Sequence, residues 1–216
     1  KTLKINNYIY SNKGKIDKFY FKLNKTIGSS ILKKNIDNLH LKNSNIVFRY
    51  ALDKKNYINI EGQYSIDKKK YQSYTLKNNF FKDVSKTILD FEISEKFNID
   101  FINYQKDEGK TAKIYIDFSR KKNLLDLKDF KYSENKNFIS IKNLKLDKKE
   151  FVSVKKIKVK TFKKNDLKND FTLDFGKKIK ILGTKYDAKN LNKFINQKSQ
   201  NNLLKKVSKD IDIDLK

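Results

Sequence analysis

Apolar and polar residues alternate along most of the chain. "IVFRYAL" at residues 46–52, "YINIEGQYSI" at residues 57–66 and "AKIYIDFS" at residues 112–119 show the pattern, and Lys, Asp, Asn and Ser recur between the apolar positions. A two-residue period predicts antiparallel strands with one apolar and one polar face. Short connections such as "DKKE" at residues 147–150 predict turns between them. We therefore predict a mainly β fold, an antiparallel meander or curled sheet with one apolar face that forms a groove-like repeat.

Helical spacing of apolar residues appears in a few places, and it predicts two or three short helices. Phe80, Phe81, Val84 and Ile88 predict an amphipathic helix over residues 79–91. A second helix is predicted near residues 187–196, and a third short turn near residues 203–207. The pattern over residues 25–40 fits either a helix or a loop.

One internal similarity suggests a repeat. "SEKFNIDF" at residues 94–101 aligns with "SKDIDIDL" at residues 208–215, and each copy follows a stretch with helical apolar spacing. We therefore divide the chain into an N-terminal β segment (residues 1–76) and a β repeat unit (residues 77–216), in which residues 208–216 start the next repeat. Because the chain contains no methionine, we interpret it as a processed chain or an internal segment of a longer protein.

The formal net charge of +26 raises the question of a polyanionic partner. Only Arg49 and Arg120 are arginines among 51 basic residues, and Asn, Ile, Phe and Tyr are also abundant. This composition is typical of A/T-rich codon usage, whereas nucleic-acid-binding proteins usually use arginine for bidentate contacts. Tyrosines interleaved with lysine, such as Tyr104, Tyr115 and Tyr132, suit a stacking surface but also suit strands. A basic nucleic-acid-binding β-domain remains an alternative hypothesis.

Motifs for catalysis or for metal binding are incomplete. "GKT" at residues 109–111 has Tyr104 where a phosphate-binding loop requires a glycine, and a predicted strand follows it. Asp210, Asp212 and Asp214 suggest a calcium loop, but they alternate with apolar residues, as on the polar face of a strand. One histidine, His40, and no cysteine leave no multi-histidine or thiolate metal site. We therefore expect a protein that is not an enzyme, with no cofactor and no metal.

Residues 124–196 carry a family resemblance. They contain "IKNLKL", "FVSVKKIKV", "NDFTL" and "ILGTKYDAKNL", with the spacing I-x-G-x-x-Y-D-A-x-x-L in the last motif. This series resembles the AsmA-like superfamily, in particular its YhdP- and TamB-type envelope lipid-transport proteins. The resemblance implies a β-groove that binds phospholipid acyl chains and conducts them between membranes. It also implies a location in the periplasm of a diderm bacterium and an inner-membrane anchor outside this segment.

The apolar positions of the alternating strands are the candidates for the lipid groove. They are Ile58, Ile60, Tyr64, Ile66, Ile114, Ile116, Phe118, Ile139, Ile141, Val152, Val154, Ile179 and Ile181. The resemblance implies a structural joint at Gly183, Tyr186, Asp187 and Leu191, where Asp187 suits a helix N-cap between the apolar residues of a hydrophobic staple. We expect phospholipid and membrane as partners and no specific nucleic acid or metal. A structural surface repeat, similar to those of adhesins, is the third hypothesis.

Overall fold

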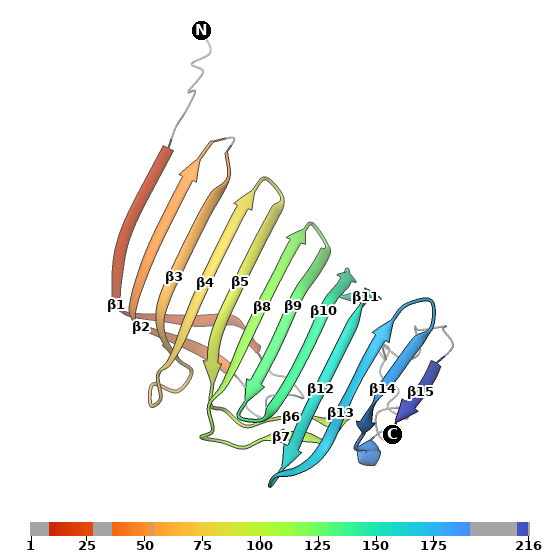
Figure 1. Cartoon of the computed structure of the whole chain (residues 1–216). Coiled ribbons are helices and arrows are strands. Elements are labelled where there is room, and N and C mark those ends of the chain that lie inside the picture. The colour runs from red at the N-terminus through yellow and green to blue at the C-terminus, as the bar shows by residue number, and fades with distance from the viewer. Residues whose placement is uncertain (1–8, 28–35, 53, 191–210, 216) are drawn as a thin grey trace.

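The computed structural model describes residues 9–27, 36–52, 54–190 and 211–215, and strands dominate it (Figure 1). The elements in chain order are β1 (Ile9–Ile27), β2 (Ile36–Ala51), β3 (Asn56–Ser65), β4 (Gln72–Phe81), β5 (Val84–Ile93), β6 (Phe97–Ile99), η1 (Asp100–Ile102), β7 (Tyr104–Lys106), β8 (Ala112–Lys121), β9 (Leu124–Glu134), β10 (Asn137–Asp147), β11 (Glu150–Ser153), β12 (Lys156–Lys163), β13 (Asp166–Phe175), β14 (Ile179–Lys185), η2 (Ala188–Asn190) and β15 (Ile211–Leu215). The prediction of a mainly β fold is confirmed.

The strands form one long open sheet. Neighbours in the sheet follow the order β1-β2-β3-β4-β5-β8-β9-β10-β12-β13-β14-β15, and β11 pairs only with β10. All of these pairs are antiparallel except β14 with β15, which is parallel. β1 and β15 lie at opposite ends of this order, so the sheet is a meander that does not close into a barrel.

Tight turns with left-handed backbone residues join many strands. Lys82, Lys122, Asn135, Lys148 and Lys164 each have φ between 47° and 53° and stand directly after a strand. A positive φ at the first central residue is what a two-residue hairpin turn requires, because its twist matches that of the strands. The Asp-, Asn- and Lys-rich connections are therefore turns, as the sequence predicts.

The predicted helix over residues 79–91 is wrong. Asn79 and Phe80 pair with Lys86 and Ser85 across the hairpin of β4 and β5, whose turn lies at residues 82–83. The i, i+4 spacing that suggested a helix is produced by two strands that meet at a turn. β4 also pairs with β3, and β5 also pairs with β8. An isolated amphipathic helix would not have these neighbouring strands to stabilise it.

The other predicted helices fall mainly outside the described residues. Over residues 187–196 the structure describes only the short 3₁₀ helix η2, and over residues 203–207 it describes nothing. The ambiguous stretch 25–40 contributes the end of β1 and the start of β2. The position between residues 76 and 77, where the sequence suggested a boundary, lies inside β4.

The two similar segments near residues 94–101 and 208–215 occupy different places. The first contains β6, which pairs with β7 in a separate two-stranded sheet. The second contains β15, which joins the edge of the main sheet beside β14. Figure 1 shows β6 and β7 crossing near the lower ends of the long strands, and β1 and β2 bending sharply near the same end.

Candidate functional site

One face of the sheet is apolar across ten strands. In the antiparallel part of the sheet, residues that pair directly across strands point to the same face. Pairing therefore aligns a single apolar row from β2 to β14: Ile46, Ile60, Leu76, Leu89, Ile116, Phe130, Ile141, Ile157, Leu173 and Ile181. At about 4.8 Å between strands, this row is roughly 43 Å long.

A second row on the same face forms the core of the protein. It runs through Tyr74, Phe91, Ile114, Tyr132, Ile139, Val159 and Phe171. The segment Phe97–Lys106, which contains β6, η1 and β7 and which we call the cover, packs on it. Phe97, Ile102 and Tyr104 from the cover are each about 95% buried or more in this cluster. The cover therefore supplies the second layer that the lower part of the apolar face needs.

The upper part of the apolar face is not covered to the same extent. Nine of its residues are half-buried and lie outside the core cluster. We call them the open apolar strip: Ile46, Phe48, Ile58, Ile60, Leu76, Leu89, Ile116, Phe118 and Ile141. At the β1 side of the strip, Ile46, Phe48 and Ile58 line a hollow of about 280 Å³ together with Tyr10, Asn12 and Gly14. The strip is thus an accessible apolar surface along the sheet.

Ten of the thirteen predicted groove residues lie on the apolar face. Ile58, Ile60, Ile116, Phe118 and Ile141 belong to the open apolar strip. Tyr64 lies on the same face at the end of β3, where its hydroxyl donates to the Glu92 carbonyl. Ile114, Ile139, Ile179 and Ile181 lie in or against the core cluster under the cover, so they form protein core.

Three predicted groove residues lie elsewhere. Ile66 is in the bend that follows β3. Val152 is on the short strand β11, where it is 53% exposed, and Val154 is buried in the link between β11 and β12. Alternation alone suggested these positions. Their departure follows from the turn after Ser65 and from the shift in register between β10 and β11.

Ile46, Phe48, Leu76 and Leu89 belong to the strip but were absent from the predicted groove, and the last two were also not predicted as strand residues. Leu76 stands at the assumed end of the N-terminal segment, and Leu89 stands in the predicted helix. Both continue a two-residue alternation, Tyr74–Leu76 in β4 and Thr87–Leu89–Phe91 in β5. This alternation was the signal in the sequence that would have identified them as strand residues.

The opposite face of the sheet is polar and rich in ion pairs. The Lys142 and Lys131 ammonium groups each lie 3.0 Å from the Asp129 carboxylate, and the Lys160 ammonium lies 2.7 Å from Asp170. Burial acts to raise the pKa of the Asp129 carboxyl, but the hydrogen bonds and charges of Lys142 and Lys131 together hold it below its ordinary value. Several lysines of this face are therefore paired with aspartates.

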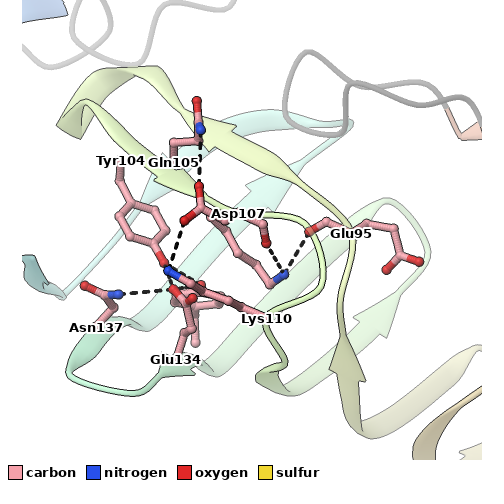
Figure 2. A network of polar contacts seen from close by, with 9 residues as sticks. Glu95, Tyr104, Gln105, Asp107, Lys110, Glu134 and Asn137 are labelled. Carbon is pink, nitrogen blue, oxygen red and sulfur yellow. Dashed lines mark hydrogen bonds and ion pairs between the residues drawn. The ribbon is translucent and has the colours of Figure 1, made fainter. Parts of the chain in front are cut away.

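A buried polar network fastens one side of the cover to the sheet (Figure 2). The Tyr104 hydroxyl on β7 donates to the Glu134 carboxylate on β9 and lies 2.6 Å from the Tyr132 hydroxyl. Asn137 also donates to Glu134, at 3.1 Å. Glu134 is 4% exposed, so these donors compensate the loss of water around its charge. Burial and the hydrogen bond to Glu134 raise the pKa of the Tyr104 hydroxyl far above its ordinary value.

Lys106, at the end of the cover, is fully buried. Its ammonium group donates to the Glu95 and Asp107 carbonyls, each at 3.0 Å (Figure 2). Burial lowers the pKa of this group, and the nearby charge of Glu134 acts in the opposite direction. These contacts hold the C-terminal end of the cover, where the chain continues into the loop before β8.

The predicted structural joint fastens the other side of the cover. Asp187 accepts a hydrogen bond from the Lys189 amide at 3.2 Å, as an N-cap of η2 does, and another from the Asn103 side chain at 2.9 Å. The Tyr186 hydroxyl donates to the Phe101 carbonyl. Asn169, fully buried on β13, donates to the Ile102 carbonyl and accepts from the Asp187 amide. Leu191, the other staple residue, lies outside the described residues.

Gly183 is required where the joint leaves β14. A Cβ atom there would lie 2.3 Å from the Asp170 carbonyl oxygen and 2.6 Å from the Phe171 Cα. The register between β13 and β14 shifts at this point. The glycine therefore allows a close backbone approach at an irregularity in the sheet.

Metal and membrane-spanning features are lacking in the described ranges. No group of three or more His, Cys, Asp or Glu side chains gathers there as a metal site would. Similarly, none of the described helices is long and apolar enough to cross a membrane. No family model, curated protein or solved structure matches the chain. The two faces of the sheet are therefore the features of the described residues that bear on function.

Proposed function

We propose that this chain is a non-enzymatic segment of an envelope lipid-transport protein and that its open apolar strip holds phospholipid acyl chains. The observation that carries the proposal is the continuous row of apolar side chains across ten strands. Its residues on β2 to β8 are half-buried and lie outside the core cluster. An exposed apolar surface of this extent is typical of a binding site rather than of a free surface.

The dimensions and the energetics suit acyl chains. The hydrocarbon core of a bilayer is about 30 Å thick and two chains deep, so one chain is about 15 Å long. The part of the row outside the core cluster, from Ile46 on β2 to Ile116 on β8, spans four strand spacings, or roughly 19 Å, which exceeds that length. Removing an acyl chain from water is favourable by about 0.8 kcal/mol for each buried CH₂ group. Binding of this kind requires an apolar surface and no catalytic residue.

The location of the basic residues supports lipid over nucleic acid as the ligand. Lysines such as Lys131, Lys142 and Lys160 lie on the face opposite the strip and are paired with aspartates. A nucleic-acid interface needs unpaired cations that displace counterions from phosphates. The resemblance to the AsmA-like superfamily leads to the same proposal, including a location in the envelope of a diderm bacterium.

Two neighbouring residues on β3 allow a matched test. Ile60 lies on the open apolar strip, whereas Asn59 points to the polar face, where it pairs with Lys77. We expect native mass spectrometry after gentle purification to detect co-purified phospholipid on the wild-type chain. Ile60→Asp should reduce the lipid-bound fraction at least about tenfold, because an ionised carboxylate in the apolar strip is costly to desolvate.

Asn59→Asp is the control, since it adds the same charge to the other face. We expect it to keep the wild-type lipid content, and circular dichroism should show the same strand content in both variants. Equal lipid content in the two variants would refute the assignment of the face. An absence of lipid on the wild-type chain, together with salt-sensitive oligonucleotide binding, would refute the proposed function.

A further inference from the structure

Arg120 lies at the upper end of the apolar face in a hollow that combines apolar and cationic side chains. The turns of the β4–β5 and β8–β9 hairpins lie side by side along one edge of the sheet (Figure 1). Between them is a hollow of about 330 Å³. Its lining consists of Phe80, Lys82, Asp83, Val84, Ser85, Arg120 and Lys122.

The pairing register places this hollow in continuity with the open apolar strip. Phe80, Ser85 and Arg120 form one cross-strand row. The next row toward the middle of the sheet contains Asn78, Thr87 and Phe118, and the one after it contains Leu76, Leu89 and Ile116, so the apolar connection to the strip runs along β8. Ile116, Phe118 and Arg120 alternate along β8, so the side chain of Arg120 projects on the apolar side of the sheet. A molecule that lies along the strip reaches the hollow at its end.

The cations of the hollow differ from those of the polar face. Arg120 Nε donates to the Lys122 carbonyl at 3.1 Å, which orients the guanidinium group. Among the described residues, no carboxylate lies within ion-pair distance of Arg120, Lys82 or Lys122. Asp83 also lines the hollow, and the Lys82 ammonium group lies 5.2 Å from the centre of the Phe81 ring, which leaves Arg120 and Lys122 as the cations without such a partner. The hollow therefore has a net positive charge beside an apolar surface.

We infer that this hollow binds the phosphate of an anionic lipid headgroup while the acyl chains of the same molecule lie along the strip. The inference rests on the proposed function and specifies the class of lipid. The planar guanidinium of Arg120 matches two phosphate oxygens, and the Lys122 ammonium group adds a point charge. Phe80 and Phe118 provide apolar contact for the first methylene groups.

The test compares two lipids with the same chains, dioctanoyl phosphatidic acid and dioctanoyl glycerol, by isothermal titration calorimetry. We expect the wild-type chain to bind the phosphatidic acid at least about tenfold more tightly. Arg120→Gln should weaken that affinity about tenfold and leave the affinity for the neutral lipid unchanged. Arg120→Lys, which keeps the charge without the planar fork, should give an intermediate loss.

Lys164→Gln is the matched control for charge. It removes one cation from the turn between β12 and β13, and in Figure 1 that turn lies at the opposite edge of the sheet. We expect it to change the affinity for phosphatidic acid less than about twofold. An equal loss in Lys164→Gln and Arg120→Gln would mean that overall charge determines binding, which would overturn the site.

The remaining outcomes separate this inference from the proposed function. Equal affinity for both lipids, unaffected by Arg120→Gln, would overturn the headgroup site and leave acyl-chain binding in place. Binding of neither lipid would overturn the proposed function and the site together. Inorganic phosphate, titrated alone, should show no saturable binding. Saturable phosphate binding that depends on Arg120 and gains nothing from acyl chains would assign the hollow to free phosphate.

Discussion

At the scale of single residues, buried hydroxyl and amide groups decide how the cover is held. Tyr104 and Tyr132 place their hydroxyls beside the Glu134 carboxylate, and Asn169 connects the cover with the joint. Strand propensity and the alternating pattern favoured strands for the two tyrosines, and both residues lie in strands. The sequence contained no signal for the network, because Tyr104, Tyr132 and Glu134 meet only through the packing of the cover against β9.

The raised pKa of these tyrosines makes alkaline stability a test of the network. Burial raises the pKa of Tyr104 and Tyr132 above the ordinary value of about 10. The folded state therefore keeps protons that the unfolded state loses. Its advantage is complete below pH 10 and declines above it, by up to about 1.4 kcal/mol per pH unit for each tyrosine.

We expect the free energy of unfolding, measured with urea, to fall less steeply between pH 10 and pH 11.5 in Tyr104→Phe than in the wild-type chain. Tyr10→Phe, a change at a tyrosine that is 46% exposed, should keep the wild-type slope. Parallel slopes for Tyr104→Phe and wild type would contradict the buried position of this hydroxyl.

At the scale of elements, turn geometry decides between strand and helix. The residues around 79–91 have helical spacing, but Lys82 adopts a left-handed conformation and reverses the chain. The strands on both sides of this hairpin then provide hydrogen bonds that spacing within a single segment does not indicate. Short hairpin connections were predictable from Asp, Asn and Lys. The cover was not, because its position depends on contacts with distant strands.

The β10–β11 turn provides a test of this geometry. Lys148 and Lys149 have φ of 49° and 70°, a conformation that costs a non-glycine residue about 1–2 kcal/mol. Lys149→Gly should therefore raise the free energy of unfolding by about 0.5–1 kcal/mol, after the entropy of glycine in the unfolded chain is subtracted.

Lys136→Gly is the matched control, at the second position of the β9–β10 turn. Lys136 does not have a positive φ, so we expect this variant to lower the free energy of unfolding by about 0.5–1 kcal/mol. Urea unfolding of both variants measures the difference. A destabilised Lys149→Gly chain would show that the turn does not adopt the left-handed conformation.

At the scale of the whole molecule, the sheet is too long for its cover. The cover spans the lower part of the apolar face, and the open apolar strip extends beyond it toward β2. The alternation of apolar residues predicted one apolar face, which is confirmed, and it located five residues of the strip. It did not distinguish residues under the cover, such as Ile139, from residues of the strip, because both have the same spacing.

Acyl-chain contact along the strip is the central claim, and photo-crosslinking tests it most directly. A photoreactive amino acid is placed in turn at Leu76, Leu89 and Ile116 on the strip and at Lys77, Ile88 and Tyr115 on the opposite face. Ile88 is an apolar residue on the polar face, so it separates the effect of the face from that of hydrophobicity. We predict lipid adducts at the first three positions and none at the other three. Equal labelling of both faces, or labelling of neither, would contradict the account.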